Sequence, residues 1–144
     1  MTAEDYIKAL GMEPLVDEGG WFAPCWRAAD DKTVSVIYYL LKRGEVSRWH
    51  QLQSNEIWTW HAGGVLEMTL GGTGDWPGTR ETRETRLIGP QSPVGVVPER
   101  VWQTTRVVEG DFALVSCVVA PAFQDEECYL PHPSVEEVEL HDKL

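Results

Sequence analysis

Short runs of β-branched and aromatic residues, separated by glycine, proline and asparagine turns, are the feature that most limits the fold of this chain. About eight to ten such runs occur, with turn residues roughly every 6 to 12 positions, a spacing typical of all-β sandwiches and barrels. The runs include residues 21–27 and 94–97, and the strongest is 33–41. A helix is expected only near the N-terminus, between a Thr2 cap and Gly11. We therefore expect an all-β barrel or double-sheet jelly roll with one short N-terminal helix.

Two glycine-containing segments are predicted to reverse the direction of the chain. Residues 62–64 should form a tight turn between two strands, and residues 109–111 should form the tip of a hairpin. Both predictions follow from apolar runs on either side of each glycine.

The C-terminal part of the chain has a different composition. From residue 121 onward proline and acidic residues are frequent, which predicts an extended arm that docks weakly or pairs with a partner chain. We expect one domain over residues 1–144, with its core at about 5–125 and an acidic tail at 126–144.

Composition limits the classes of partner. The chain has 144 residues, of which 42% are hydrophobic, so a globular domain is expected. The net charge of −11 argues against binding to nucleic acid or to an anionic membrane surface. No apolar run approaches the roughly 20 residues that span a bilayer, and no secretory signal is expected.

The cysteines indicate a reducing environment. Cys25, Cys117 and Cys128 are widely spaced, odd in number and form no CxxC pair. This pattern predicts a cytoplasmic location and thiols that serve as small buried hydrophobic side chains.

Residues 44–63 carry the main candidate site. They are expected to form strand, turn and strand, with His50 at the end of the first strand and Glu56 at the start of the second. Strand side chains alternate between faces, so Glu56, Trp58 and Trp60 should share one face. A carboxylate is rarely buried without a partner, so this face predicts a pocket. The alternatives are an ion pair of Glu56 with Arg48 or Arg106, and tryptophans that only fill the core.

Four further residues bear on the prediction. Tyr38 and Tyr39 alternate along one strand, so only one faces the barrel interior; we take Tyr38 as the ligand-binding candidate, although the sequence leaves the choice open. Arg48 is a second candidate for ligand contact. His61 lies on the opposite strand face from Glu56 and is expected to be structural.

The spacing of these residues resembles that of a known superfamily. The motif from Gly44 through His50, Leu52 and Glu56 to Gly63 is similar to the first cupin motif, and residues 92–107 are similar to the second. Several blocks resemble the DUF985 (cupin_5) family over about residues 5–125, among them Glu18-Gly19-Gly20-Trp21-Phe22, Ser54-Asn55-Glu56-Ile57-Trp58 and Val101-Trp102-Gln103. The resemblance implies a homodimeric cupin-type double-stranded β-helix, often compared with sugar-nucleotide epimerases. It implies no settled reaction.

The metal positions of the cupin motif are altered in this chain. Metal-binding cupins place three histidines and one glutamate around a transition metal. Here Leu52 stands at the second histidine position and Gln103 at the third. We therefore expect no tightly bound metal and no cofactor. His50, Glu56 and Gln103 would provide at most a weak site completed by water.

Two classes of function follow for a cavity on which His50, Glu56 and Gln103 converge. The first is an isomerase-like or epimerase-like enzyme acting on a carbohydrate or sugar-nucleotide-like molecule. His50 would be the general base, Glu56 would tune it, and a pocket tyrosine would return the proton. The second is a non-catalytic sugar- or nucleotide-binding protein. The same cavity residues would then serve as ligand contacts, together with Trp58, Trp60, Tyr38 and Arg48. The sequence does not separate these classes, because a fold does not fix its chemistry.

Overall fold

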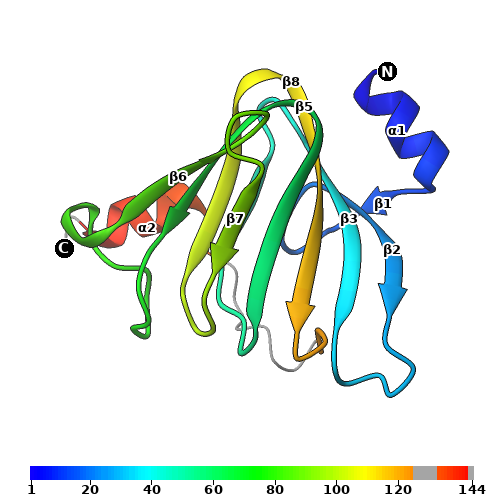
Figure 1. Ribbon diagram of the computed structural model, residues 1–144. Helices are drawn as coiled ribbons and strands as arrows, with labels where there is room; N and C mark the ends of the chain where they lie inside the picture. Colours follow the sequence, from blue (N-terminus) through cyan, green and yellow to red (C-terminus); the bar gives the residue numbers. More distant parts are fainter. Residues whose placement is uncertain (125–132, 143–144) are drawn as a thin grey trace.

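The computed structural model describes residues 1–124 and 133–142 (Figure 1). The N-terminal half contains α1 (Ala3–Leu10), β1 (Glu13–Pro14), β2 (Trp21–Arg27), β3 (Ser35–Lys42), β4 (Val46–His50) and β5 (Asn55–Leu70). It is followed by a 3-10 turn (Arg80–Thr82), β6 (Glu84–Ile88), β7 (Val94–Val97), β8 (Gln103–Ala120) and α2 (Val135–Asp142). The predicted all-β jelly roll with a short N-terminal helix is confirmed.

The strands form one antiparallel sheet that curves into a barrel. Its order is β1-β2-β3-β8-β5-β6, with β4 paired to β8 and β7 paired to β5. Strand β5 pairs with β8 along nearly its whole length, from Asn55 opposite Ala120 to Leu70 opposite Gln103. Strand β3 pairs with the second half of β8, and β4 with the first half. The two long strands therefore form the centre of the sheet, to which β3, β4, β6 and β7 are paired.

The two predicted chain reversals are wrong, because β5 runs through residues 62–64 and β8 runs through residues 109–111. The pairing of β5 with β8 shifts between Trp60 and Ala62 and again after Gly63, so the strands bend there without turning back. A Cβ atom at Gly64 would lie 1.7 Å from the carbonyl oxygen of Glu109. Glycine marks close backbone approach at a bulge as well as a turn, and the sequence pattern is the same in both cases.

Helix α1 has the termini that the sequence predicts. The Thr2 side chain accepts a hydrogen bond from the Asp5 amide, and the Asp5 carboxylate accepts one from the Thr2 amide. Gly11 ends the helix with a φ of 63°. The helix lies against the outer side of the sheet, where its apolar side chains contact a cluster built on Met12, Ala23, Leu40 and Leu114.

The C-terminal tail contains a second helix, so the expected extended arm is wrong for residues 135–142. Ser134 and Glu137 form a reciprocal cap: the Ser134 amide donates to the Glu137 carboxylate at 2.7 Å, and the Glu137 amide donates to Ser134 Oγ at 3.1 Å. Val138 is buried against Trp49 and Trp102, on the outside of the barrel. Residues 125–132, including Cys128, lie outside the described part of the chain.

The barrel interior is filled mainly by large apolar side chains. Tyr39, Trp58, Leu66, Met68 and Ile88 are each at most 1% exposed. Cys117 belongs to this core as expected, whereas Cys25 is exposed on β2, contrary to the prediction for it. In the described residues, no helix is long and apolar enough to cross a bilayer.

Candidate functional site

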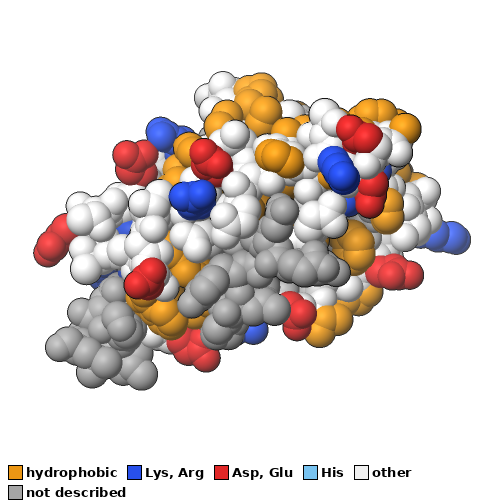
Figure 2. All heavy atoms as spheres, turned by 90° about the horizontal axis from the view of Figure 1, so that it is seen from below, with side chains coloured by type: hydrophobic (Ala, Val, Ile, Leu, Met, Phe, Trp, Pro, Cys, Tyr) orange, Lys and Arg blue, Asp and Glu red, His pale blue; other side chains and the backbone are white. Residues whose placement is uncertain are grey.

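A cavity of about 390 Å³ opens at the end of the barrel where β2 ends and β3 and β5 begin. Figure 2 looks onto this end, where hydrophobic, acidic and basic side chains lie close together. The wall is contributed by β2, β3, β5, β8 and the segments before β2, between β4 and β5, and after β8. It consists of Leu15, Asp17, Glu18, Phe22, Arg27, Ser35, Ile37, Tyr39, Leu52, Glu56, Cys117, Val119 and Phe123. Its volume and its mainly apolar wall are typical of small-molecule sites.

Glu56 lines the cavity from the start of β5 and is only 6% exposed. Its Oε1 accepts a hydrogen bond from Gln103 Nε2 at 2.8 Å and another from Trp58 Nε1 at 3.1 Å. Burial raises the pKa of Glu56; Glu18 raises it further, while His50 and the two hydrogen bonds act in the opposite direction. Glu56 and Gln103 are thus joined by a hydrogen bond, but Gln103 is not among the residues that line the cavity, where the sequence placed it.

The alternative ion pairs of Glu56 with arginine are not formed. Arg106 Nη2 lies 3.0 Å from Glu67, and Arg48 Nη2 lies 3.7 Å from Glu137. Arg48 therefore points away from the cavity toward α2, and its predicted ligand contact is not supported.

His50 lies behind the cavity wall and is 2% exposed. Its Nδ1 is 2.7 Å from the carbonyl oxygen of Arg48, and its Nε2 is 3.5 Å from Glu18 Oε1. A carbonyl oxygen only accepts, so Nδ1 carries a proton, and Nε2 is the ring nitrogen that faces Glu18. The sequence placed His50 itself in the cavity, whereas the structure places Glu18 between His50 and the space a ligand would fill.

Glu18 is the site residue that the sequence analysis missed. The segment before β2 holds it next to β4: the Arg48 amide donates to the Glu18 carbonyl at 2.7 Å, and Ser47 Oγ donates to Glu18 Oε2 at 2.9 Å. Tyr39 fixes the following peptide by donating its hydroxyl to the Gly19 carbonyl at 2.6 Å. The available signal was an acid directly before paired glycines, since such glycines let a loop approach a strand closely.

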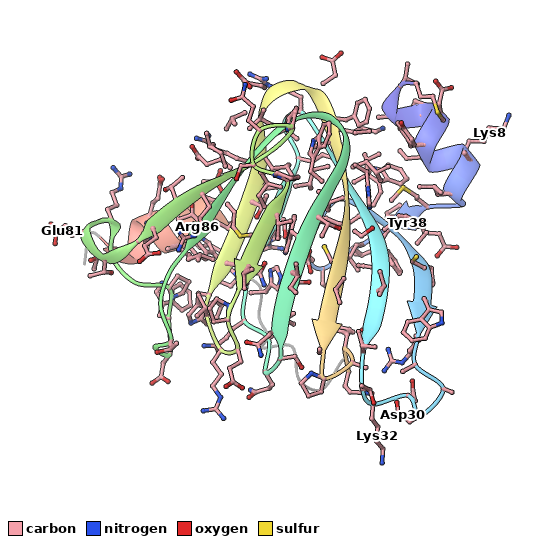
Figure 3. All side chains as sticks on the ribbon, viewed as in Figure 1. Lys8, Asp30, Lys32, Tyr38, Glu81 and Arg86 are labelled. Carbon is pink, nitrogen blue, oxygen red and sulfur yellow. The ribbon has the colours of Figure 1, made fainter. Side chains whose placement is uncertain are left out.

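Tyr39, not Tyr38, is the tyrosine of the cavity. Tyr39 is 1% exposed and lines the wall, and burial raises its pKa well above the ordinary value. Tyr38 lies on the outer side of β3, where it packs with the cluster under α1 and with the ring of His61. Figure 3 shows Tyr38 near the helix. Side chains alternate between the two faces of a strand, but the sequence does not say which face lies inside the barrel. It therefore could not decide between Tyr38 and Tyr39.

The two tryptophans of β5 lie on the same face of the strand, before its bend, and both pack on the barrel core. Trp58 lies in the core, with its ring edge-on to Tyr39 at 5.5 Å between centroids. Trp60 is half-buried and donates to the carbonyl of Gly64 at 2.9 Å. Neither lines the cavity; Phe22, Tyr39 and Phe123 provide its aromatic wall. The predicted stacking role of Trp58 and Trp60 is therefore corrected.

The residues at the cupin metal positions do not fit three histidines and one glutamate. Leu52 lines the cavity with an apolar side chain, and Gln103 uses its amide nitrogen on Glu56. Gln103 Oε1 is buried, with no hydrogen-bond partner among the described residues. Within residues 1–124 and 133–142, no group of three or more His, Cys, Asp or Glu side chains is placed to hold a metal ion.

Comparison with known proteins agrees with the fold and the motif. A family profile described as the cupin superfamily (DUF985) matches residues 4–130. A structural-genomics protein from Shewanella oneidensis is 29% identical with a TM-score of 0.81, covering 100% of this chain and 94% of its own. A hypothetical protein from Leishmania major is 24% identical with a TM-score of 0.80, covering 91% and 88%.

More distant structures share the fold alone. A cupin 2 conserved barrel domain protein from Rhodopseudomonas palustris is 17% identical with a TM-score of 0.59, covering 88% of this chain and 75% of its own. A search of curated proteins found no match. The family profile covers most of the sequence, and the barrel is the one that the motif implies. The chain therefore belongs to the DUF985 family of the cupin superfamily.

Proposed function

We propose that the barrel cavity binds a small organic molecule and that the Glu18–His50 pair moves a proton to or from it in an isomerase-like reaction. The observation that supports this proposal is a carboxylate on the cavity wall backed by a buried imidazole at 3.5 Å. The Arg48 carbonyl fixes the histidine tautomer, so Nε2 can take up the proton that Glu18 receives from the ligand. Glu18 is then the catalytic base, and His50 is a positioning and relay residue.

Tyr39 shapes the wall beside the proposed base. Its hydroxyl proton is donated to the Gly19 carbonyl, and its raised pKa keeps it protonated at neutral pH. The hydroxyl oxygen can therefore accept a hydrogen bond from a ligand hydroxyl group, while the proton that Glu18 takes from the ligand returns from Glu18. The tyrosine that the sequence proposes as proton donor is thus assigned here to ligand positioning.

The charges of the cavity favour a neutral or cationic ligand. Asp17, Glu18 and Glu56 line it, and Arg27 is the basic lining residue. The Arg27 guanidinium is already bound to Asp31 and to the carbonyl of Phe123. A diphosphate would meet more negative than positive charge here, so a neutral carbohydrate-like molecule fits better than a sugar nucleotide.

A non-catalytic binding protein is the second candidate. The polar groups of the wall already bond one another: Ser47 and His50 contact Glu18, and Gln103 and Trp58 contact Glu56. Such mutual bonds also support a rigid receptor, in which both carboxylates accept hydrogen bonds from ligand hydroxyl groups.

The binding step can be tested with the compound that mass spectrometry recovers from protein purified from its native host. Calorimetric titration of this compound should show at least about tenfold weaker binding to Glu18→Gln and to Glu56→Gln, the loss of about 1.4 kcal/mol. Glu67→Gln is a matched control, because Glu67 pairs with Arg106 outside the cavity wall. Unchanged binding to both cavity variants would contradict a ligand in this cavity.

We also propose a homodimer in a reducing, cytoplasmic compartment. The family resemblance supports the dimer, and the unpaired thiols of Cys25 and Cys117 support the compartment.

A further inference from the structure

One row of directly paired residues crosses five neighbouring strands. Val96 on β7 pairs with Ile57 on β5, and Ile57 pairs with Val118 on β8. Val118 pairs with Val36 on β3, and Val36 pairs with Trp26 on β2. The five strands lie side by side in Figure 1. Residues directly opposite each other in antiparallel strands point to the same side, so these side chains form one surface, the Trp26–Val96 row.

The row lies on the outer side of the barrel and is open to solvent. Its neighbours along the strands, such as Glu56 on β5 and Val97 on β7, point inward and are buried. Trp26 is 58% exposed, Val96 is 49% exposed and Ile57 is 38% exposed. Single exposed apolar residues are ordinary, but a continuous apolar surface across a sheet is typical of an interaction site.

The adjoining positions of this outer face carry no charge either. One register step away, Thr59 pairs with Val94 and with Ser116, and Ser116 pairs with Tyr38. On the other side, Asn55 pairs with Ala120. Uncharged rows of this extent are unexpected in a chain with 23 acidic and 12 basic residues.

Helix α1 covers only part of the same side of the sheet. Its apolar side chains contact a cluster that includes Tyr38, Ala62 and Phe112, beside the second half of β3 and the middle of β8. Ile57 and Val96 lie beyond that cluster and keep their exposure.

We propose that the Trp26–Val96 row is the contact surface for a second copy of this chain. Two chains of net charge −11 repel each other, and they can approach at low electrostatic cost where neither presents a carboxylate. A two-fold axis would set the same uncharged row on each side of the contact. A strongly charged partner would find no complementary charge on this face. The inference rests on the proposed homodimer, and it adds the surface through which the dimer forms.

The test compares oligomeric state between variants by sedimentation velocity and light scattering. Wild type should have about twice the chain mass of 16.2 kDa at micromolar concentration. Val96→Lys and Trp26→Lys, at opposite ends of the row, should sediment as monomers with unchanged circular dichroism. Each dimer buries two introduced lysines, so the dissociation constant should rise by about 100-fold, about tenfold for each lysine. Leu87→Lys is the matched control, because Leu87 is 54% exposed on β6 and lies outside the row; it should stay dimeric.

The possible outcomes separate the two claims. A wild-type monomer at 100-fold higher concentration would refute both the dimer and the face. A dimer that survives both Val96→Lys and Trp26→Lys would refute the face alone, as would dissociation caused equally by Leu87→Lys. A folded monomer for the row variants with a dimeric control would support the proposal.

Discussion

At the scale of single residues, the site is defined by two acids in different surroundings. Glu56 is buried with neutral donors on Oε1, whereas Glu18 is partly open to the cavity and contacts Ser47 and His50. Burial penalises the charged form of a carboxylate, and nearby acids increase the penalty. Substitution of Glu56 and substitution of Glu18 should therefore have different effects on the protein.

Glu56→Gln should stabilise the protein increasingly as pH rises from about 4 to 7. The folded-state pKa of Glu56 lies above its ordinary value of 4.5, so wild type loses stability as pH rises through 4.5 toward that pKa. The amide keeps an oxygen for Gln103 and Trp58 without a charge. The free energy gained by the variant should grow by about 1.4 kcal/mol for each pK unit of that shift. Urea unfolding of both proteins at pH 4, 5.5 and 7 checks this, and a gain that shrinks with pH would contradict it.

His50→Ala should lower the free energy of unfolding by about 1 to 3 kcal/mol, the cost of leaving buried polar groups unbonded. The lost ring contacts both the Arg48 carbonyl and Glu18. His61→Ala is the control, since His61 is exposed on the outer side; its effect should be under about 1 kcal/mol. Equal melting curves for the two variants would show that the His50 contacts contribute little.

Purified protein should carry far less than one transition metal ion per chain. The reason is chemical: Leu52 offers no ligand atom, and Gln103 bonds Glu56 through its amide nitrogen. Elemental analysis after dialysis measures this, and near-stoichiometric iron, manganese, nickel or zinc would contradict it.

At the scale of elements, the barrel depends on two long bent strands. Strands β5 and β8 pair along nearly their whole length, and the bend occurs where Gly63 and Gly64 approach β8. The sequence predicted strands at the right places, with 21–27 and 94–97 matching β2 and β7 in full. It misread the two bends as turns, because both need glycine between apolar runs. Helix α2 was predictable in principle from the spacing of Ser134 and Glu137, which form its cap.

Gly64→Ala should destabilise the fold by about 3 kcal/mol or more, because the added methyl group would overlap backbone that cannot move alone. The new Cβ would lie 1.7 Å from the Glu109 carbonyl oxygen. Gly74→Ala is the matched control: its nearest neighbour is the Trp76 carbonyl oxygen at 3.6 Å, an ordinary contact. Thermal melts should show a large shift for the first variant and little for the second. Similar melting temperatures would contradict the account of the bend.

At the scale of the whole molecule, the sequence predicted the superfamily and the position of the cavity better than the residues that line it. Glu56 and Gln103 meet because motif spacing fixes their strands. Tyr38 was chosen over Tyr39 because alternation gives two faces without saying which is inside. Glu18 escaped notice because its place depends on a loop that folds back onto β4, a contact over 29 residues of sequence.

If Glu18 removes a proton from a carbon of the bound compound, hydrogen at that carbon should exchange with solvent, which binding alone would not cause. The compound recovered from the cavity, incubated with protein in deuterium oxide, should gain deuterium at the carbon that is deprotonated. Wild type should catalyse this exchange. Glu67→Gln should exchange at the wild-type rate, because Glu67 does not line the cavity.

Deuterium incorporation by Glu18→Gln is the most direct test of the proposed function. The amide occupies the same space but cannot accept the proton, so general-base catalysis worth about 100- to 10,000-fold should be lost. We predict that mass spectrometry and proton NMR will show exchange with wild type and at least about 100-fold slower exchange with Glu18→Gln. Exchange at equal rates in both proteins, or none in wild type with the ligand bound, would contradict the assignment of Glu18 as the base.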